Sequence, residues 1–337
     1  MTAELRLPYE TEVMLYPCPP FHFDGTVYKP SYFPGPDLVY ETGHVWHSLR
    51  FEDQLFGVRM DNMGSIDAPA VRLVIFSEKP LDPGRVERIS GEMAVRYDLF
   101  SDLRSFYDAA LQDDLLAPAA ERWRGMRPSS YSSLYEYLVI ATVLQNATIR
   151  RSIQMMNNLF ERFGTPLRFD GRVLAGFWSP EDIQAASEDE LRQLKLGYRA
   201  KTLKRQAESF VRDGSSAEGK PILDEQYLRS LETPDLKRAL LTIYGIGQAS
   251  VWYLLFGQFR RYDAFDYISP WEQKIFSRLL FDQELVEAQV ILKEVERRWG
   301  SGPFAGKKML AAHILFEDLF WQWRNQQVPW LDELIRR

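Results

Sequence analysis

The spacing of hydrophobic residues divides the chain into two parts with different periods. Up to about residue 80, short runs rich in Val, Tyr and Phe partly alternate with polar residues, which is typical of half-buried strands. Turn-forming Gly and Pro residues separate four such runs, which we expect to form one antiparallel sheet: HFDGTVYKP, LVYETGHVWHSLRFED, LFGVRMDNMG and AVRLVIFS. Two runs with helical spacing follow, RVERISGEMAVRYDL and DLRSFYDAALQD, and we expect them to lie on that sheet.

From about Leu116 the hydrophobic period changes to 3.6 and keeps that value to the end of the chain. Helices are predicted over 134–144 and 149–163 with the sequence QNAT between them, and a linker then leads to Trp178. The predicted fold class is therefore α+β. Residues 1–115 form an N-terminal α/β domain with an antiparallel sheet, and residues 116–337 form an all-helical domain.

A helix, a tight hairpin and a second helix are predicted over residues 233–257. Thr233 is a good N-cap, and Pro234 suits the first turn of a helix. The hairpin Gly245-Ile246-Gly247 has two glycines around one aliphatic residue, which permits a turn too tight for Cβ atoms and leaves backbone N–H groups pointing outward. The helix that follows can bind a phosphate at its start, although a plain corner between two helices gives the same pattern.

A lone carboxylate, Asp266, lies about nineteen residues beyond the hairpin. It comes just before a new helix, whose start is marked by Ser269, Pro270 and Glu272. Ser followed three residues later by Glu is a capping box, which fixes the entrance of a helix.

Taken together, these features resemble the helix-hairpin-helix (HhH-GPD) superfamily of DNA glycosylases, most closely its alkyl-purine and 8-oxoguanine branches. Three further segments are similar to family motifs: LVIATVLQNATIRRSI, DELRQLKLGYRAKTLKRQA and RRWGSGPFAGKKMLAAHILF. The resemblance covers about two hundred residues in order. It implies a monomer that binds double-stranded DNA, flips out a damaged base and hydrolyses its N-glycosidic bond in base excision repair.

The resemblance also implies roles for individual residues. Asp266 takes the position of the catalytic carboxylate, with Asp263 as a weaker choice; an ungapped match to the alkyl-purine branch places Ser269 there instead. The residues implied in DNA binding are Gln145, Asn146, Tyr198, Arg199, Gly245, Gly247 and Ala249. Those implied in the base pocket are Tyr253, Trp271, His313 and Phe316, with Trp321 as a further possibility.

Two residues bear on the reaction and on the substrate. Bifunctional relatives carry a lysine nucleophile where this chain has Ala249, so we expect a monofunctional hydrolase that leaves the strand intact. The 8-oxoguanine branch has a glutamine where this chain has Ala312, while aromatic walls suit cationic alkylated purines. We therefore expect an alkylated purine as substrate; the alternative is a non-catalytic protein that binds lesion-bearing DNA with the same hairpin.

Composition limits the other possibilities. The single cysteine, Cys18, excludes an internal disulfide and a four-cysteine iron–sulfur cluster, and we expect no cofactor and no metal. His22, His44 and His47 lie in strand-like segments without metal-ligand spacing. Because the net charge is −6, a DNA-binding surface of this protein has to be a local basic face. The basic runs that could form it are 150–151, 199–205, 260–261 and 307–308. No apolar run reaches a membrane span and no signal pattern begins the chain, so we expect a cytoplasmic protein at the nucleoid.

Overall fold

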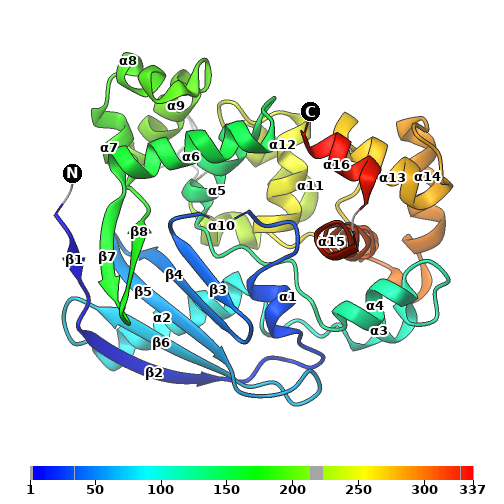
Figure 1. The fold of residues 1–337 in the computed structure, drawn as a ribbon, viewed down its shortest axis with the longest axis horizontal. Helices are drawn as coiled ribbons and strands as arrows, with labels where there is room; N and C mark the ends of the chain where they lie inside the picture. The colour runs from blue at the N-terminus through cyan, green and yellow to red at the C-terminus, as the bar shows by residue number, and fades with distance from the viewer. Residues whose placement is uncertain (1–2, 34, 213–222, 327, 337) are drawn as a thin grey trace.

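A five-stranded antiparallel sheet forms the N-terminal part of the protein. The computed structural model describes residues 3–33, 35–212, 223–326 and 328–336. The strand order is β2-β6-β5-β4-β3, with bounds Tyr9–Leu15 for β2, Val71–Ser77 for β6, Gln54–Asn62 for β5, His44–Phe51 for β4 and Leu38–Glu41 for β3. Figure 1 shows this sheet on one side of the molecule and the helical part above and beside it.

Both faces of the sheet are covered. On one face, Val58 and Ile75 pack with Ile89 and Met93 of helix α2 (Pro83–Arg96) in one buried cluster. On the other, Val74 and Phe76 pack against a β-hairpin made of β7 (Thr165–Phe169) and β8 (Arg172–Gly176). This hairpin also pairs with β1 (Leu5–Arg6), and Figure 1 shows it reaching down from the helices along the sheet. Apolar residues at successive positions of β6 therefore pack into two separate hydrophobic cores, one on each face of the sheet.

Two sequence predictions for this region are wrong. The run HFDGTVYKP is not a strand, because it contains helix α1 (Phe23–Val27), whose N-cap His22 accepts a hydrogen bond from the Gly25 amide at 3.0 Å. The predicted linker before Trp178 is the β7–β8 hairpin, with Gly171 at a φ of +71° in its turn. The remaining predicted strands and the α2 helix are present, and β1 and β2 are additional strands. The position predicted for the second helix is wrong as well, because α3 (Arg104–Ala110) packs with other helices and not on the sheet.

The helical part consists of two groups of helices. The first group comprises α5 (Leu134–Leu144), α6 (Ile149–Phe163), α7 (Pro180–Ala185), α8 (Glu188–Leu191), the turn η1 (Arg192–Leu196), α9 (Arg199–Val211), α10 (Glu225–Ser230), α11 (Thr233–Leu241), α12 (Gln248–Tyr253) and the turn η2 (Leu254–Gln258). The second comprises α3 (Arg104–Ala110), α4 (Ala117–Trp123), α13 (Pro270–Phe281), α14 (Ala288–Trp299), the turn η3 (Gly302–Phe304), α15 (Lys308–Gln326) and α16 (Pro329–Arg336). One buried cluster joins α3 and α4 to α14 and α15, so it crosses the boundary predicted near residue 115. None of the helices in the described part of the chain has both the length and the apolar character to span a membrane.

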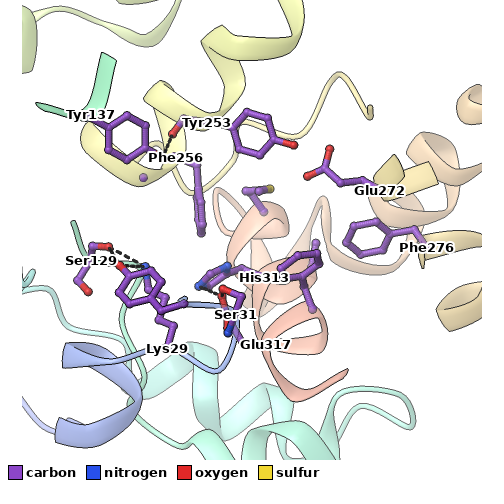
Figure 2. Close-up of a pocket in the computed structure, with 15 residues that line it drawn as sticks. Lys29, Ser31, Ser129, Tyr137, Tyr253, Phe256, Glu272, Phe276, His313 and Glu317 are labelled. Atoms are coloured by element: carbon purple, nitrogen blue, oxygen red, sulfur yellow. Dashed lines mark hydrogen bonds and ion pairs between the residues drawn. The ribbon is translucent and has the colours of Figure 1, made fainter. Parts of the chain in front are cut away.

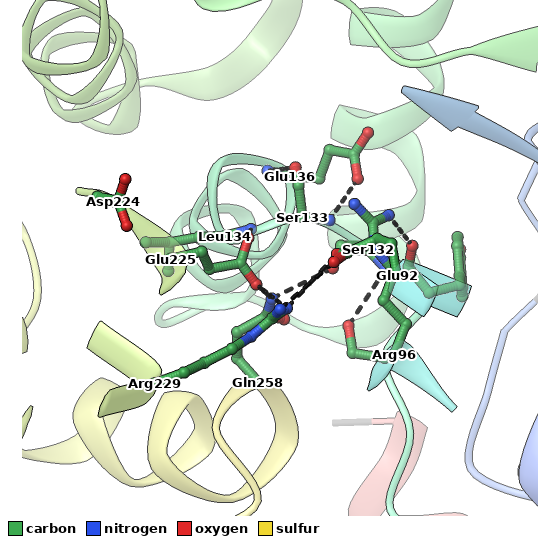
Figure 3. A network of polar contacts seen from close by, with 12 residues as sticks. Glu92, Arg96, Ser132, Ser133, Leu134, Glu136, Asp224, Glu225, Arg229 and Gln258 are labelled. Carbon is green, nitrogen blue, oxygen red and sulfur yellow. Dashed lines mark hydrogen bonds and ion pairs between the residues drawn. The ribbon is translucent and has the colours of Figure 1, made fainter. Parts of the chain in front are cut away.

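A polar network fixes the helices to the sheet domain (Figure 3). Arg229 of α10 donates to Glu225 at 2.7 Å and to Glu92 of α2 at 3.3 Å. Glu225 also accepts from the Leu134 amide at the start of α5 and from the Gln258 side chain in η2. Because both carboxylates are at most one-fifth exposed and have several donors each, this network ties η2 and α5 to the N-terminal domain.

Candidate active site

The helix-hairpin-helix predicted over 233–257 is present as α11, a hairpin and α12. Gly245 has a φ of +83°, and a Cβ added to it would lie 2.3 Å from the Thr202 Cγ2 atom of α9. Gly247 is extended, with a φ of −108° and open space around it, so of the two hairpin glycines only Gly245 has a conformation that requires glycine. The first hydrogen bond of α12 joins the Val251 amide to the Gly247 carbonyl at 3.0 Å. The amides of residues 248–250, including that of the exposed Ala249, precede this bond at the start of the helix.

The loop between α5 and α6 contacts the hairpin directly. The Gln145 side-chain nitrogen donates to the Gly245 carbonyl at 3.0 Å and to the Ser250 hydroxyl at 3.2 Å. Asn146 is exposed with a φ of +48°, and its side-chain nitrogen lies 3.4 Å from the Tyr198 hydroxyl. Asn146 is not a helix cap, because Thr148 caps α6. Residues Gln145 to Thr148 are called the interhelical loop below. This loop contacts the hairpin through Gln145 and presents the exposed side-chain amide of Asn146.

Tyr198 and Arg199 differ in their exposure. Tyr198 is 53% exposed, as predicted for a residue that stacks on DNA. Arg199, which would have to face outward to contact DNA, is instead 2% exposed and donates to the Gln145 carbonyl. Its guanidinium carbon lies 4.6 Å from the centre of the Tyr198 ring, and burial lowers its pKa. Arg199 therefore supports the interhelical loop from beneath.

A pocket of about 210 Å³ lies between α12, α13, α15 and the segment after α1 (Figure 2). Aromatic side chains form most of its walls: Tyr137, Tyr253, Phe256, Phe276 and Phe316. Three of the four predicted pocket residues, Tyr253, His313 and Phe316, lie in the lining. Trp271 does not; its ring lies behind the lining, with its centre 6.0 Å from that of Phe316 and 6.2 Å from that of Phe320. Trp321 also lies elsewhere, with the Arg122 guanidinium 3.9 Å from its ring centre.

Polar groups gather on the pocket side formed by the segment after α1, which sequence reasoning missed. The Lys29 ammonium donates to the Ser129 carbonyl at 2.6 Å and to the Tyr32 hydroxyl at 3.3 Å, and burial lowers the pKa of Lys29 to about 8. Glu317 accepts from the Ser31 amide at 2.9 Å and from its hydroxyl at 2.8 Å. Lys29 was missed because the run that contains it was interpreted as a strand.

His313 lies beside this polar group. Its Nε2 atom is 3.7 Å from the Glu317 carboxylate and has no hydrogen-bond partner in the structure. Burial lowers the pKa of His313 well below its ordinary range, so the ring is neutral at pH 7. A buried neutral imidazole nitrogen without a partner can bond to a polar edge of a bound base.

Glu272 faces the pocket from α13, next to Tyr253 (Figure 2). The predicted capping box is present: the Ser269 hydroxyl accepts from the Glu272 amide at 3.3 Å, and the Glu272 carboxylate accepts from the Ser269 amide at 3.1 Å. Burial raises the pKa of Glu272, while Ser269 and the Tyr253 hydroxyl offset part of that effect. The sequence marked Glu272 only as half of a helix cap.

Asp266 lies outside this pocket. Its side chain is 62% exposed, and one carboxylate oxygen is 3.2 Å from the Lys308 ammonium, which also binds Glu296 at 2.8 Å. The structure therefore does not bring Asp266 together with Tyr253 and Phe316, and its catalytic role stays a prediction. Asp263, the weaker choice, is exposed and is likewise absent from the pocket lining.

A basic surface lies beside the interhelical loop. A groove of about 660 Å³ is lined by Arg150, Arg151, Arg192 and Lys195, with Thr148, Gln154, Met155 and Gly197 between them. Other basic residues serve the fold. Arg261 donates to the Leu231 carbonyl, and burial lowers the pKa of Arg260. Lys204, in the basic run 199–205, donates to two carbonyls at the end of α7, so its ammonium is engaged within the protein.

Comparison with known proteins points to one family. Residues 139–335 match the sequence profile described as the HhH-GPD superfamily base excision DNA repair protein. A DNA-3-methyladenine glycosylase of Bacillus subtilis is 25% identical over 177 residues, which are 52% of this chain and 56% of that protein. An N-glycosylase/DNA lyase of Saccharomyces cerevisiae is 29% identical over 147 residues, which are 41% of this chain and 39% of that protein. The chain thus aligns with about half or less of the length of these relatives.

The fold has a close counterpart among solved structures. The 3-methyladenine DNA-glycosylase of Archaeoglobus fulgidus superposes with a TM-score of 0.72 over 94% of this chain and all of that one, at 16% identity. The predicted α+β class with a helical glycosylase fold is therefore confirmed.

Proposed function

Because the chain belongs to the HhH-GPD superfamily of base excision DNA repair proteins, we propose that it is a DNA glycosylase. It binds double-stranded DNA, takes one damaged base into the aromatic pocket and hydrolyses its N-glycosidic bond. The base must leave the duplex, since its sugar cannot be reached inside the stack.

One relationship carries this proposal: the hairpin and the pocket share helix α12. Ala249 lies in the exposed first turn of this helix, and Tyr253 lines the pocket from its last residue. Four residues span about 6 Å along a helix axis, which is close to the spacing of successive nucleotides. A phosphate held at the hairpin amides would thus place a neighbouring nucleotide over the pocket. The interhelical loop with Asn146 would fill the gap in the stack.

For the substrate we propose an alkylated purine. The aromatic walls offer π-faces to a cationic base, and a cationic purine is a good leaving group. Ala312 contributes no polar group to the lining where the 8-oxoguanine branch has glutamine. The names of the Bacillus subtilis and Archaeoglobus fulgidus proteins agree with this class.

We also propose that water, and no amine, attacks the sugar. The side chain at position 249 is a methyl group. Lys29 is the one amine in the described pocket lining, and its ammonium is engaged by Ser129 and Tyr32 away from Glu272. The second candidate, a glycosylase with lyase activity, rests on this same Lys29, because a buried lysine with a lowered pKa can form a Schiff base.

Duplexes that each carry one lesion (an alkylated purine, hypoxanthine or 8-oxoguanine) test the proposal. After incubation with the protein, strand breaks are measured with and without hot alkali. Breaks that appear only after alkali, and chiefly on the alkylated duplex, support a monofunctional alkyl-purine glycosylase. Borohydride trapping separates the second candidate: a covalent adduct that Lys29→Met abolishes would establish the lyase. A protein that binds these duplexes without releasing any base would be the non-catalytic alternative.

A further inference from the structure

Among the helix starts that the structure describes, three have a capping box, and the carboxylate of one box lines the pocket. The pairs are Ser133 with Glu136 on α5, Ser179 with Asp182 on α7, and Ser269 with Glu272 on α13. Among their acidic members, Glu272 is the one that lines the aromatic pocket. A capping box engages one carboxylate oxygen, and the Glu272 carboxylate also interacts with the Tyr253 hydroxyl in the pocket wall, so it faces the pocket.

The carboxylates near the pocket differ in their partners. Asp266 is paired with Lys308, and both oxygens of Glu317 accept hydrogen bonds from Ser31 on the Lys29 side. In the described part of the chain, no Lys, Arg or His nitrogen lies within salt-bridge distance of Glu272. Glu272 is therefore available to a ligand, whereas Asp266 has a cationic partner and both oxygens of Glu317 are occupied by Ser31.

We propose that Glu272 is the catalytic carboxylate, in place of Asp266, and that it faces the sugar of the flipped nucleotide. This inference rests on the proposed function. Glu272 lies next to Tyr253, the pocket residue on the hairpin's own helix, and on the side away from Lys29 (Figure 2). A nucleotide whose phosphate lies at the hairpin and whose base lies between Tyr253 and Phe316 has its sugar at this side of the pocket.

The reaction that Glu272 assists is a hydrolysis. The bond between C1′ and the base nitrogen breaks, and its electron pair leaves with the base, which becomes neutral if it was a cationic alkylated purine. The sugar becomes oxocarbenium-like, and the carboxylate stabilises its positive charge. Water oxygen then bonds to C1′, and a water proton passes to the Glu272 carboxylate. The Ser269 amide holds the other oxygen in place, and the start of α13 favours the ionised form.

Glu272→Gln tests this role while leaving the fold intact, because glutamine also completes a capping box. Base release from an alkylated duplex in single turnover should fall by a factor of about 100 or more, and duplex affinity should stay within about threefold. Glu136→Gln is the matched control. Glu136 is also a glutamate that completes a capping box, it is 6% exposed, and it lies outside the pocket. It should release base at the wild-type rate.

Three other results would have distinct meanings. If wild type is active and Glu272→Gln is equally active, the role of Glu272 is overturned while the glycosylase function stands. If Asp266→Asn instead loses base release, the role belongs to Asp266; we expect this variant to stay within about threefold of wild type, since a surface ion pair contributes little. If wild type releases no base from any duplex, the proposed function fails.

Discussion

The side-chain amide of Gln145 donates to the Gly245 carbonyl oxygen at 3.0 Å, which joins the interhelical loop to the hairpin. Both segments are predicted to contact DNA, and they come from parts of the chain one hundred residues apart. A second bond from the same nitrogen to Ser250 at 3.2 Å fixes the loop relative to α12. These two bonds hold the interhelical loop against the hairpin and the start of α12.

Gln145→Ala removes both of these hydrogen bonds. Each is worth about 1 kcal/mol, so affinity for lesion and undamaged duplexes should fall by about fivefold or more. Fluorescence anisotropy with a labelled duplex measures the change. The matched control is Gln112→Ala, at an exposed glutamine just after α3, which should bind DNA as wild type does. Equal affinities of the Gln145 variant and wild type would show that the loop and hairpin act independently.

The two hairpin glycines should respond differently to a side chain. Gly245→Val should destabilise the fold by about 1–3 kcal/mol, because it forces a β-branched residue to a positive φ and against Thr202. Gly247→Val has an extended backbone and open space, so it should keep wild-type stability and weaken binding to every duplex by blocking access to the amides.

Urea unfolding and anisotropy on both variants check this difference. Gly91→Val on α2, where a Cβ also meets no atom within 4 Å, is the control for adding a side chain in open space. A folded Gly247→Val protein with unchanged affinity would remove the hairpin from the DNA interface.

The pH dependence of base release should report Glu272. Burial raises the pKa of its carboxyl group, and the proposed mechanism needs the ionised form. Activity is therefore present above this raised pKa and is lost as pH falls through it, so the acid limb should lie above the ordinary range of a glutamate. Single-turnover rates between pH 4 and pH 8 should show this limb in wild type and in Glu136→Gln. A limb of the same position and depth in the residual activity of Glu272→Gln would assign it to another group.

Local chemistry made the hairpin and the helix starts predictable from the sequence. Gly245-Ile246-Gly247 and the Ser269–Glu272 box depend on neighbouring residues, and the structure contains both. The segment around Phe23 was mispredicted because a short run containing Phe23, Thr26 and Val27 fits a strand as well as a buried helical turn.

The pocket was only partly predictable, since distant segments meet there. Lys29 and Ser129 are one hundred residues apart, so their hydrogen bond depends on the tertiary fold. The sequence also does not indicate the direction in which each side chain points. Asp266 and Glu272 are six residues apart, yet the turn before α13 directs one toward Lys308 and the other into the pocket. Arg199 likewise follows an exposed tyrosine and is itself buried.

Release of a free base is the most direct test of the central claim, that this pocket hydrolyses the glycosidic bond of an alkylated purine. Duplex DNA containing 7-methylguanine at one site would be incubated with wild type and with Glu272→Gln. The released small molecules would then be separated, identified and quantified by mass spectrometry. The account predicts free 7-methylguanine from wild type in an amount equal to the abasic sites formed, and at least about a hundredfold slower release from the variant. An intact duplex that stays bound to wild type, with no free base at any time, would contradict it.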